Sequence, residues 1–101
     1  MAISIGSDNL VTLSNLTDNL TGDNVNTAAV TGTLLDEDDA IVSSFNLPYV
    51  TGSNGNYQGF IPASISGDLT EGASYQIRLL VVVGSNQQVF AEWDAAVYTL
   101  I

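Results

Sequence analysis

Residues 75–101, YQIRLLVVVGSNQQVFAEWDAAVYTLI, decide the fold of this chain. Two long apolar runs, residues 75–83 and 88–101, flank the turn-forming sequence Gly84-Ser85-Asn86. Within each run apolar residues recur at alternate positions, and β-branched and aromatic residues dominate, as is typical of strands. We therefore predict a central β-hairpin in which Trp93 faces the core.

The rest of the chain carries similar short runs, which are separated by Gly, Asn, Asp and Ser. The predicted strands are residues 3–5, 9–16, 25–35, 40–50, 57–65, 75–83 and 88–101. About seven strands with turn residues between them predict an all-β protein, either a sandwich or a small barrel. We interpret residues 1–101 as a single domain, with residues 1–23 as an N-terminal strand or arm.

Charge and composition exclude several classes of function. The formal net charge is −10 and Arg78 is the only cation, so phosphate backbones and anionic membrane surfaces would repel the chain. We expect neither nucleic acid nor a membrane as a partner. The sequence has no Cys and no His, which excludes disulfides, Cys/His zinc sites, thiol nucleophiles and imidazole bases. We expect no enzymatic activity and no cofactor.

Residues 69–75, LTEGASY, have the form L-x-x-G-x-x-Y directly before a long apolar strand. This motif resembles the tyrosine corner of immunoglobulin-like sandwiches, among them fibronectin type III-like domains. The resemblance implies that the Tyr75 hydroxyl bonds to the backbone of the preceding loop and that Leu69 fills the core. Leu69, Gly72, Tyr75 and Trp93 are then structural residues. The alternative is an ordinary glycine turn followed by an aromatic strand residue.

Two further stretches resemble immunoglobulin-like modules of bacteria and phages. Residues 33–42, TLLDEDDAIV, are similar to their strand, acidic turn and strand, and residues 52–62, GSNGNYQGFIP, look like one of their hairpins. The resemblance covers residues 25–101. It departs from antibody domains because the Cys pair is missing and because Trp93 lies in the last predicted strand.

The resemblance implies an immunoglobulin-like β-sandwich of about seven antiparallel strands. It also implies a bacteriophage virion protein, because small acidic chains of this family are frequent as capsid decoration (cement), neck or tail-associated proteins. We therefore predict a non-enzymatic structural and binding protein that contacts capsid or tail proteins and is located in the virion. Self-association into a homo-oligomer is a further expectation, through an apolar second sheet face or strand addition at a sheet edge.

The alternative is an extracellular module of the bacterial cell surface, which would serve adhesion or carbohydrate binding. A sugar platform would use exposed aromatic rings, for which the candidates are Trp93, Tyr49, Tyr57 and Tyr98. Aromatic residues at alternate strand positions are more typical of a core, and Trp93 is the best core candidate.

The acidic run Asp36-Glu37-Asp38-Asp39 is a candidate Ca²⁺ site, to which Asp23, Asp68 or Glu71 would add ligands from neighbouring loops. The twelfth position counted from Asp36 is Leu47, where an EF-hand has Glu, and a solvated acidic turn is therefore favoured.

Glu92 and Asp94 lie two positions apart, on one face of the last predicted strand. A glycosidase would need such a carboxylate pair inside a substrate cleft, and nothing in the sequence builds one around them. An exposed strand face is the favoured interpretation, with Arg78 paired to Glu92 or Asp94 across the sheet.

Overall fold

The computed structural model describes residues 2–18 and 20–97. The elements, in chain order, are β1 (Ile3–Ser4), β2 (Asn9–Leu13), β3 (Ala29–Leu35), β4 (Ile41–Asn46), β5 (Tyr57–Ile61), α1 (Ala63–Ser66), β6 (Ser74–Val83) and β7 (Asn86–Val97). The predicted all-β class is confirmed. None of the described helical residues belongs to a helix long and apolar enough to cross a membrane.

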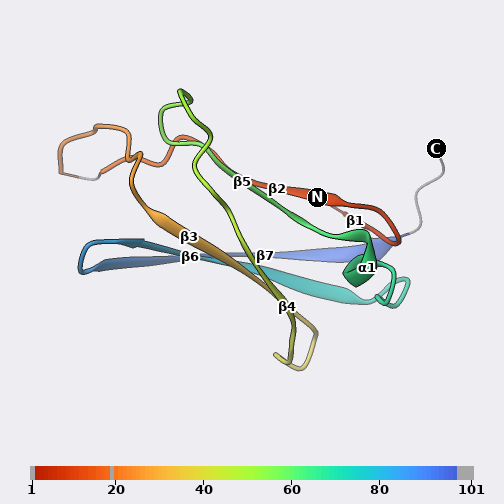
Figure 1. Cartoon of the computed structure of the whole chain (residues 1–101). Helices are drawn as coiled ribbons and strands as arrows, with labels where there is room; N and C mark the ends of the chain where they lie inside the picture. The colour runs from red at the N-terminus through yellow and green to blue at the C-terminus, as the bar shows by residue number, and fades with distance from the viewer. Residues whose placement is uncertain (1, 19, 98–101) are drawn as a thin grey trace.

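The strands form two sheets that pack face to face as a sandwich (Figure 1). One sheet has five strands in the order β1-β7-β6-β3-β4, and the other pairs β2 with β5. An immunoglobulin-like sandwich likewise places its second and fifth strands in one sheet and its third, sixth and seventh in the other. The topology therefore agrees with the predicted fold class.

The first strand differs from the prediction, since it does not run antiparallel to its neighbour. β1 pairs in parallel with the end of β7, with Ile3 opposite Ala96. Residues 1–23 were expected to form either a strand or an arm. Residues 3–4 and 9–13 are strands, because β1 and β2 both belong to sheets. Ile3 and Val11 are buried, so these strands contribute directly to the core.

The core lies between the two sheets and is built from alternate strand positions. Its buried members are Ile3, Val11, Leu16, Val30, Leu34, Leu47, Tyr57, Ile61, Leu69, Tyr75, Ile77, Leu79, Val81 and Ala96. Gly59 lets β5 approach the end of β4, because a Cβ at this position would collide with the backbone carbonyl of Asn46. This close approach helps to hold the two sheets together.

The predicted hairpin of residues 75–101 is present as β6 and β7, but Trp93 is not a core residue. Its side chain is 52% exposed, whereas Asp94 is 4% exposed. The connection is a two-residue turn, so Val83 pairs with Asn86 and Ile77 pairs with Glu92. Shifting a register by one residue turns every side chain to the opposite face, and this register directs Trp93 away from the core.

Residues 62–66 also depart from the predicted strand of residues 57–65. Pro62 cannot donate to a β-ladder, and β5 ends at Ile61. The short helix α1 follows, and its first N–H, on Ala63, donates to the Asp8 carboxylate at 2.8 Å. This contact joins the helix to the loop between β1 and β2.

Candidate interaction surface

The outer face of the five-stranded sheet exposes several large apolar residues. The turn Gly84-Ser85 determines which residues of β6 and β7 lie on this face. A two-residue hairpin turn places Leu80 opposite Val89 and Gln76 opposite Trp93. Across β3 and β4 the same face continues, with Leu35 opposite Ile41 and Gln76. We call this surface the outer sheet face; its exposed large apolar residues are Ile41, Leu80, Val89 and Trp93.

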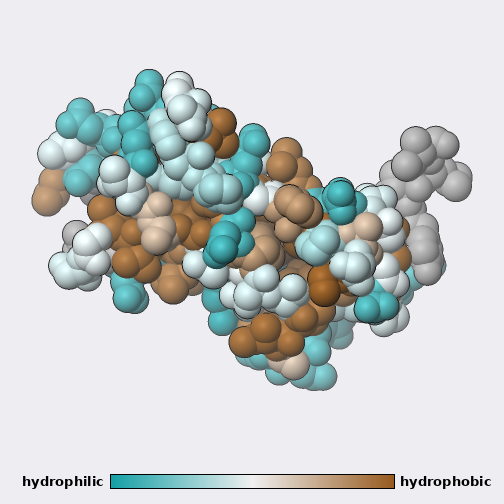
Figure 2. Space-filling model, in the orientation of Figure 1, coloured by the Kyte–Doolittle hydropathy of each residue, from teal (hydrophilic) through white to brown (hydrophobic). Residues whose placement is uncertain are grey.

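Two of these residues are more exposed than Trp93. Val89 is 56% exposed and Ile41 is 69% exposed. Figure 2 shows apolar surface over β4 at the lower edge of the molecule. An apolar patch of this kind on a soluble protein typically marks a contact surface for another macromolecule.

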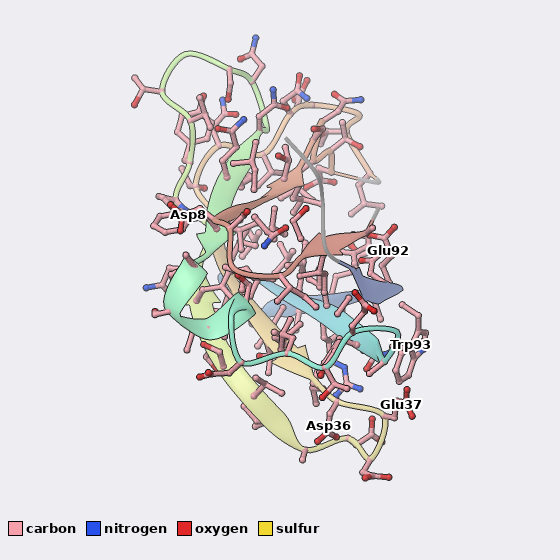
Figure 3. All side chains as sticks on the ribbon, turned by 90° about the vertical axis from the view of Figure 1, so that its right-hand side faces the viewer. Asp8, Asp36, Glu37, Glu92 and Trp93 are labelled. Atoms are coloured by element: carbon pink, nitrogen blue, oxygen red, sulfur yellow. The ribbon has the colours of Figure 1, made fainter. Side chains whose placement is uncertain are left out.

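Trp93 lies at the end of the outer sheet face that is next to the acidic turn (Figure 3). Trp93 and Glu92 project from opposite sides of β7, and Glu37 lies beside Trp93 in the same view. The Glu37 carboxylate accepts a hydrogen bond of 2.9 Å from the backbone N–H of Ser74, at the start of β6. The surface beside Trp93 is therefore polar toward Gln76, which lies opposite it on β6, and negative toward the turn.

Arg78 lies on the outer sheet face, paired in register with Ala91. Its guanidinium donates to the Gln76 side-chain oxygen at 2.6 Å and lies 4.0 Å from the Asp39 carboxylate. The predicted pairing with Glu92 or Asp94 is wrong, because these residues alternate with Ala91 and point to the opposite face of β7. The pair with Asp39 instead connects the outer sheet face to the acidic turn.

The acidic turn itself is organised by the Asp36 carboxylate. One of its oxygens accepts hydrogen bonds from the backbone N–H groups of Asp38 and Ala40, each at 2.9 Å. Glu37 is directed to β6 and Asp39 to Arg78, as described above. Among residues 2–18 and 20–97, no cluster of three or more acidic side chains is positioned to hold a metal ion. The carboxylates of Asp36, Glu37 and Asp39 thus make separate contacts within the fold.

Glu92 and Asp94 do not form a carboxylate pair at a cleft. Asp94 is buried opposite Tyr75, while Glu92 is exposed beside a cavity between β2 and β7. The predicted exposed strand face is wrong for Asp94, because the β6–β7 register turns that side of β7 inward. The burial of Asp94 removes it from contact with any polymeric substrate.

The tyrosine motif occupies the start of β6. The Tyr75 hydroxyl accepts a hydrogen bond of 3.0 Å from the backbone N–H of Thr70, in the loop before the strand. Leu69 is buried in the core, and Gly72 has a φ of +81°, a conformation that glycine adopts without strain. This local arrangement fixes the position at which β6 begins.

The four aromatic residues that were candidates for a sugar platform are not assembled into one. Tyr57 is fully buried, and its ring packs on Tyr49 at a centroid distance of 5.6 Å. Trp93 lies on the outside of the other sheet, and Tyr98 lies outside the described residues. Exposed Val89 and Ile41 were missed at the sequence level, because the register that turns Val89 outward is fixed only by the β6–β7 pairing in the fold.

Protein-family models, curated proteins and solved structures were all compared with this chain, and none of them matches it.

Proposed function

We propose that this chain is a non-enzymatic structural protein of a bacteriophage particle, which attaches to a capsid or tail protein through the outer sheet face. The observation that carries the binding role is the half-exposed Trp93 on the outer sheet face, which also carries exposed Val89, Leu80 and Ile41 farther along the sheet. Tryptophan is enriched among the residues that dominate binding energy in protein interfaces. The location in a virion rests on the resemblance of residues 25–101 to phage immunoglobulin-like modules.

The acidity of the chain supports the same proposal. A formal net charge of −10 disfavours adhesion to the packaged nucleic acid of a particle. It also favours a partner whose exposed surface is positively charged, because complementary charge speeds association. Arg78, the cation on the outer sheet face, would form an ion pair with a carboxylate of the partner.

Quantitative mass spectrometry of purified phage particles tests the location. Many copies per particle would support capsid decoration, and a few copies would support a neck or tail position. Absence of the chain from particles would overturn the virion proposal.

The contact surface is tested separately, with recombinant chain added to particles that lack it. Trp93→Ala should abolish rebinding, whereas Phe60→Ala, which removes an exposed aromatic ring from the opposite sheet, should rebind as the original chain does. Equal rebinding of both variants would contradict the assignment of the outer sheet face.

Carbohydrate binding at the bacterial surface is the second candidate. Sugar sites commonly combine several exposed rings, and Trp93 is the one aromatic residue on the outer sheet face within the part of the chain that the structure describes. This arrangement supports the protein-contact proposal more than a sugar site. A shift of tryptophan fluorescence on titration with oligosaccharides would favour the second candidate instead.

A further inference from the structure

The last strand of the five-stranded sheet has an open edge. β7 pairs with β6 from Asn86 to Ala95, whereas β1 pairs only with Ala96 and Val97. In the part of the chain that the structure describes, no other strand pairs with β7. The edge of β7 at Val89, Ala91 and Trp93 therefore has no neighbouring strand among the described residues.

The alternation of the ladder identifies the backbone groups at this edge. Ala96 donates its N–H to Ala73 and accepts from Gly72, both at 2.9 Å, so both its polar groups point away from the open edge. Residues two positions apart in an antiparallel strand point the same way, and their neighbours point the opposite way. Trp93, Ala91 and Val89 thus direct their N–H and C=O groups toward the open edge.

This edge has one of the features that usually prevent pairing with another chain, the inward-pointing charges of Glu92 and Asp94, which oppose an acidic strand. Natural edge strands are protected by Lys, Pro, bulges or inward-pointing charges. Residues 86–95 contain no Lys and no Pro, and the register between β6 and β7 runs without a bulge. The edge is therefore a continuous template for one more strand.

The space beside the edge is lined by the core. A cavity of about 230 Å³ between β2 and β7 is lined by Val11, Leu13, Ile77, Leu79 and Phe90, among others. A second cavity, of about 260 Å³, lies farther along β7 at Gln87 and Gln88 and is lined by Leu16, Val25, Val81 and Val83. A strand added to β7 would direct alternate side chains into these two cavities, since successive side chains of a strand point to opposite faces.

The charge of the residues that line the two cavities indicates which kind of segment would bind at the edge of β7. Asp18 lines one cavity and Glu92 lines the other, and neither cavity has a Lys or Arg in its lining. A second copy of this chain would bring a further net charge of −10 to the same edge, which disfavours self-pairing. A segment with Lys or Arg residues would be attracted, and apolar residues at alternate positions would fill the cavities.

We propose that the open edge of β7 binds an extended, basic segment of the partner protein, which adds as a strand and inserts alternate apolar side chains between β2 and β7. The proposal rests on the proposed function, because it names the part of the partner that this binding protein would take. Main-chain hydrogen bonds would provide affinity and the two cavities would provide sequence preference.

The test uses a fluorescently labelled synthetic peptide of nine residues, in which valine alternates with lysine or threonine, and measures its anisotropy with the full chain. Ala91→Pro removes an N–H that points to the open edge and leaves the β6 ladder intact. Ser44→Pro is the matched control on the other sheet edge. Leu47 donates its N–H to Val30, and Ser44, an odd number of positions away, directs its own N–H outward.

We expect saturable binding to the original chain and to Ser44→Pro, and at least about tenfold weaker binding to Ala91→Pro. A peptide with Glu in place of Lys should also bind at least about tenfold more weakly. Circular dichroism and urea midpoints establish that both variants fold. Two peptides that are N-methylated at alternate positions, one at the odd and one at the even residues, provide the second measurement. Methylation removes N–H donors from the peptide without altering the protein. The peptide whose methyl groups replace the N–H donors facing β7 should lose binding.

Three outcomes would overturn the proposal. They are no saturable binding to the original chain, binding that neither Ala91→Pro nor N-methylation weakens, and a dimer of the original chain that Ala91→Pro converts to a monomer. Mass spectrometry of particles separates this proposal from the proposed function. A chain that is present in particles but binds no peptide contradicts only the edge proposal, and a chain that binds peptide but is absent from particles contradicts only the virion location.

Discussion

Tyr57 and Val25 lie 32 residues apart in sequence and are joined by a hydrogen bond of 2.8 Å, from the tyrosine hydroxyl to the valine carbonyl. The same hydroxyl accepts a bond of 3.1 Å from the N–H of Ala28. Because Tyr57 is fully buried at the start of β5, it ties the long segment between β2 and β3 to the core.

Tyr57→Phe should therefore destabilise the protein by about 1–3 kcal/mol, since it removes both bonds and leaves two backbone groups in a poorly hydrated site. Urea denaturation measures the change in the free energy of unfolding. Tyr49→Phe is the control, because its hydroxyl accepts a single exposed bond of 3.3 Å from Asn54, and it should cost less than about 0.5 kcal/mol. Equal costs for the two variants would contradict the anchoring role of Tyr57.

Asp36→Ala should destabilise the protein by about 1–2 kcal/mol, because the acidic turn loses two hydrogen bonds to backbone N–H groups. Asp36→Asn keeps a side-chain oxygen at the same place and should retain most of this stability. Thermal unfolding with and without Ca²⁺ completes the measurement. A rise of Tm specific to Ca²⁺ over Mg²⁺, lost in Asp36→Asn, would show that the carboxylates act as metal ligands instead.

Gly59→Ala should destabilise the protein by about 1–3 kcal/mol or more, because its Cβ would meet the backbone carbonyl of Asn46, which cannot rotate away. Gln58→Ala changes the neighbouring exposed position and should stay within about 0.5 kcal/mol of the original chain. Chemical denaturation of both variants checks the expectation. A neutral Gly59→Ala would show that β5 and β4 are not held this closely in solution.

Trp93 is the only tryptophan, so its fluorescence reports directly on the outer sheet face. We expect acrylamide to quench the folded protein strongly, because the ring is half exposed. The acidic turn beside it should make Cs⁺ a better quencher than I⁻, and added salt should reduce this difference. Emission and quenching typical of a buried indole would contradict the orientation of β7.

The tyrosine motif before β6 and the acidic turn before β4 could be predicted from the sequence, because each is formed by residues only a few positions apart. Residues 36–39 form a turn between two strands, and Asn54 and Gly55 both have positive φ in the loop before β5. The hairpin expected at residues 52–62 is reduced to a single bridge between Tyr49 and Tyr57, because β4 and β5 belong to different sheets. The contacts of Glu37 with Ser74 and of Asp39 with Arg78 could not be predicted from the sequence. They form only because β3 pairs with β6.

Amino-acid sequence by itself determined the all-β class, the approximate positions of the strands and the turns between them, because alternation and turn chemistry are local properties. Tertiary structure alone decided which side of β7 faces the core. Both sides of that strand carry apolar residues, and a single residue of turn length exchanges them. For the same reason, only the folded chain reveals Trp93 as a surface residue, Asp94 as a buried one and the edge of β7 as open.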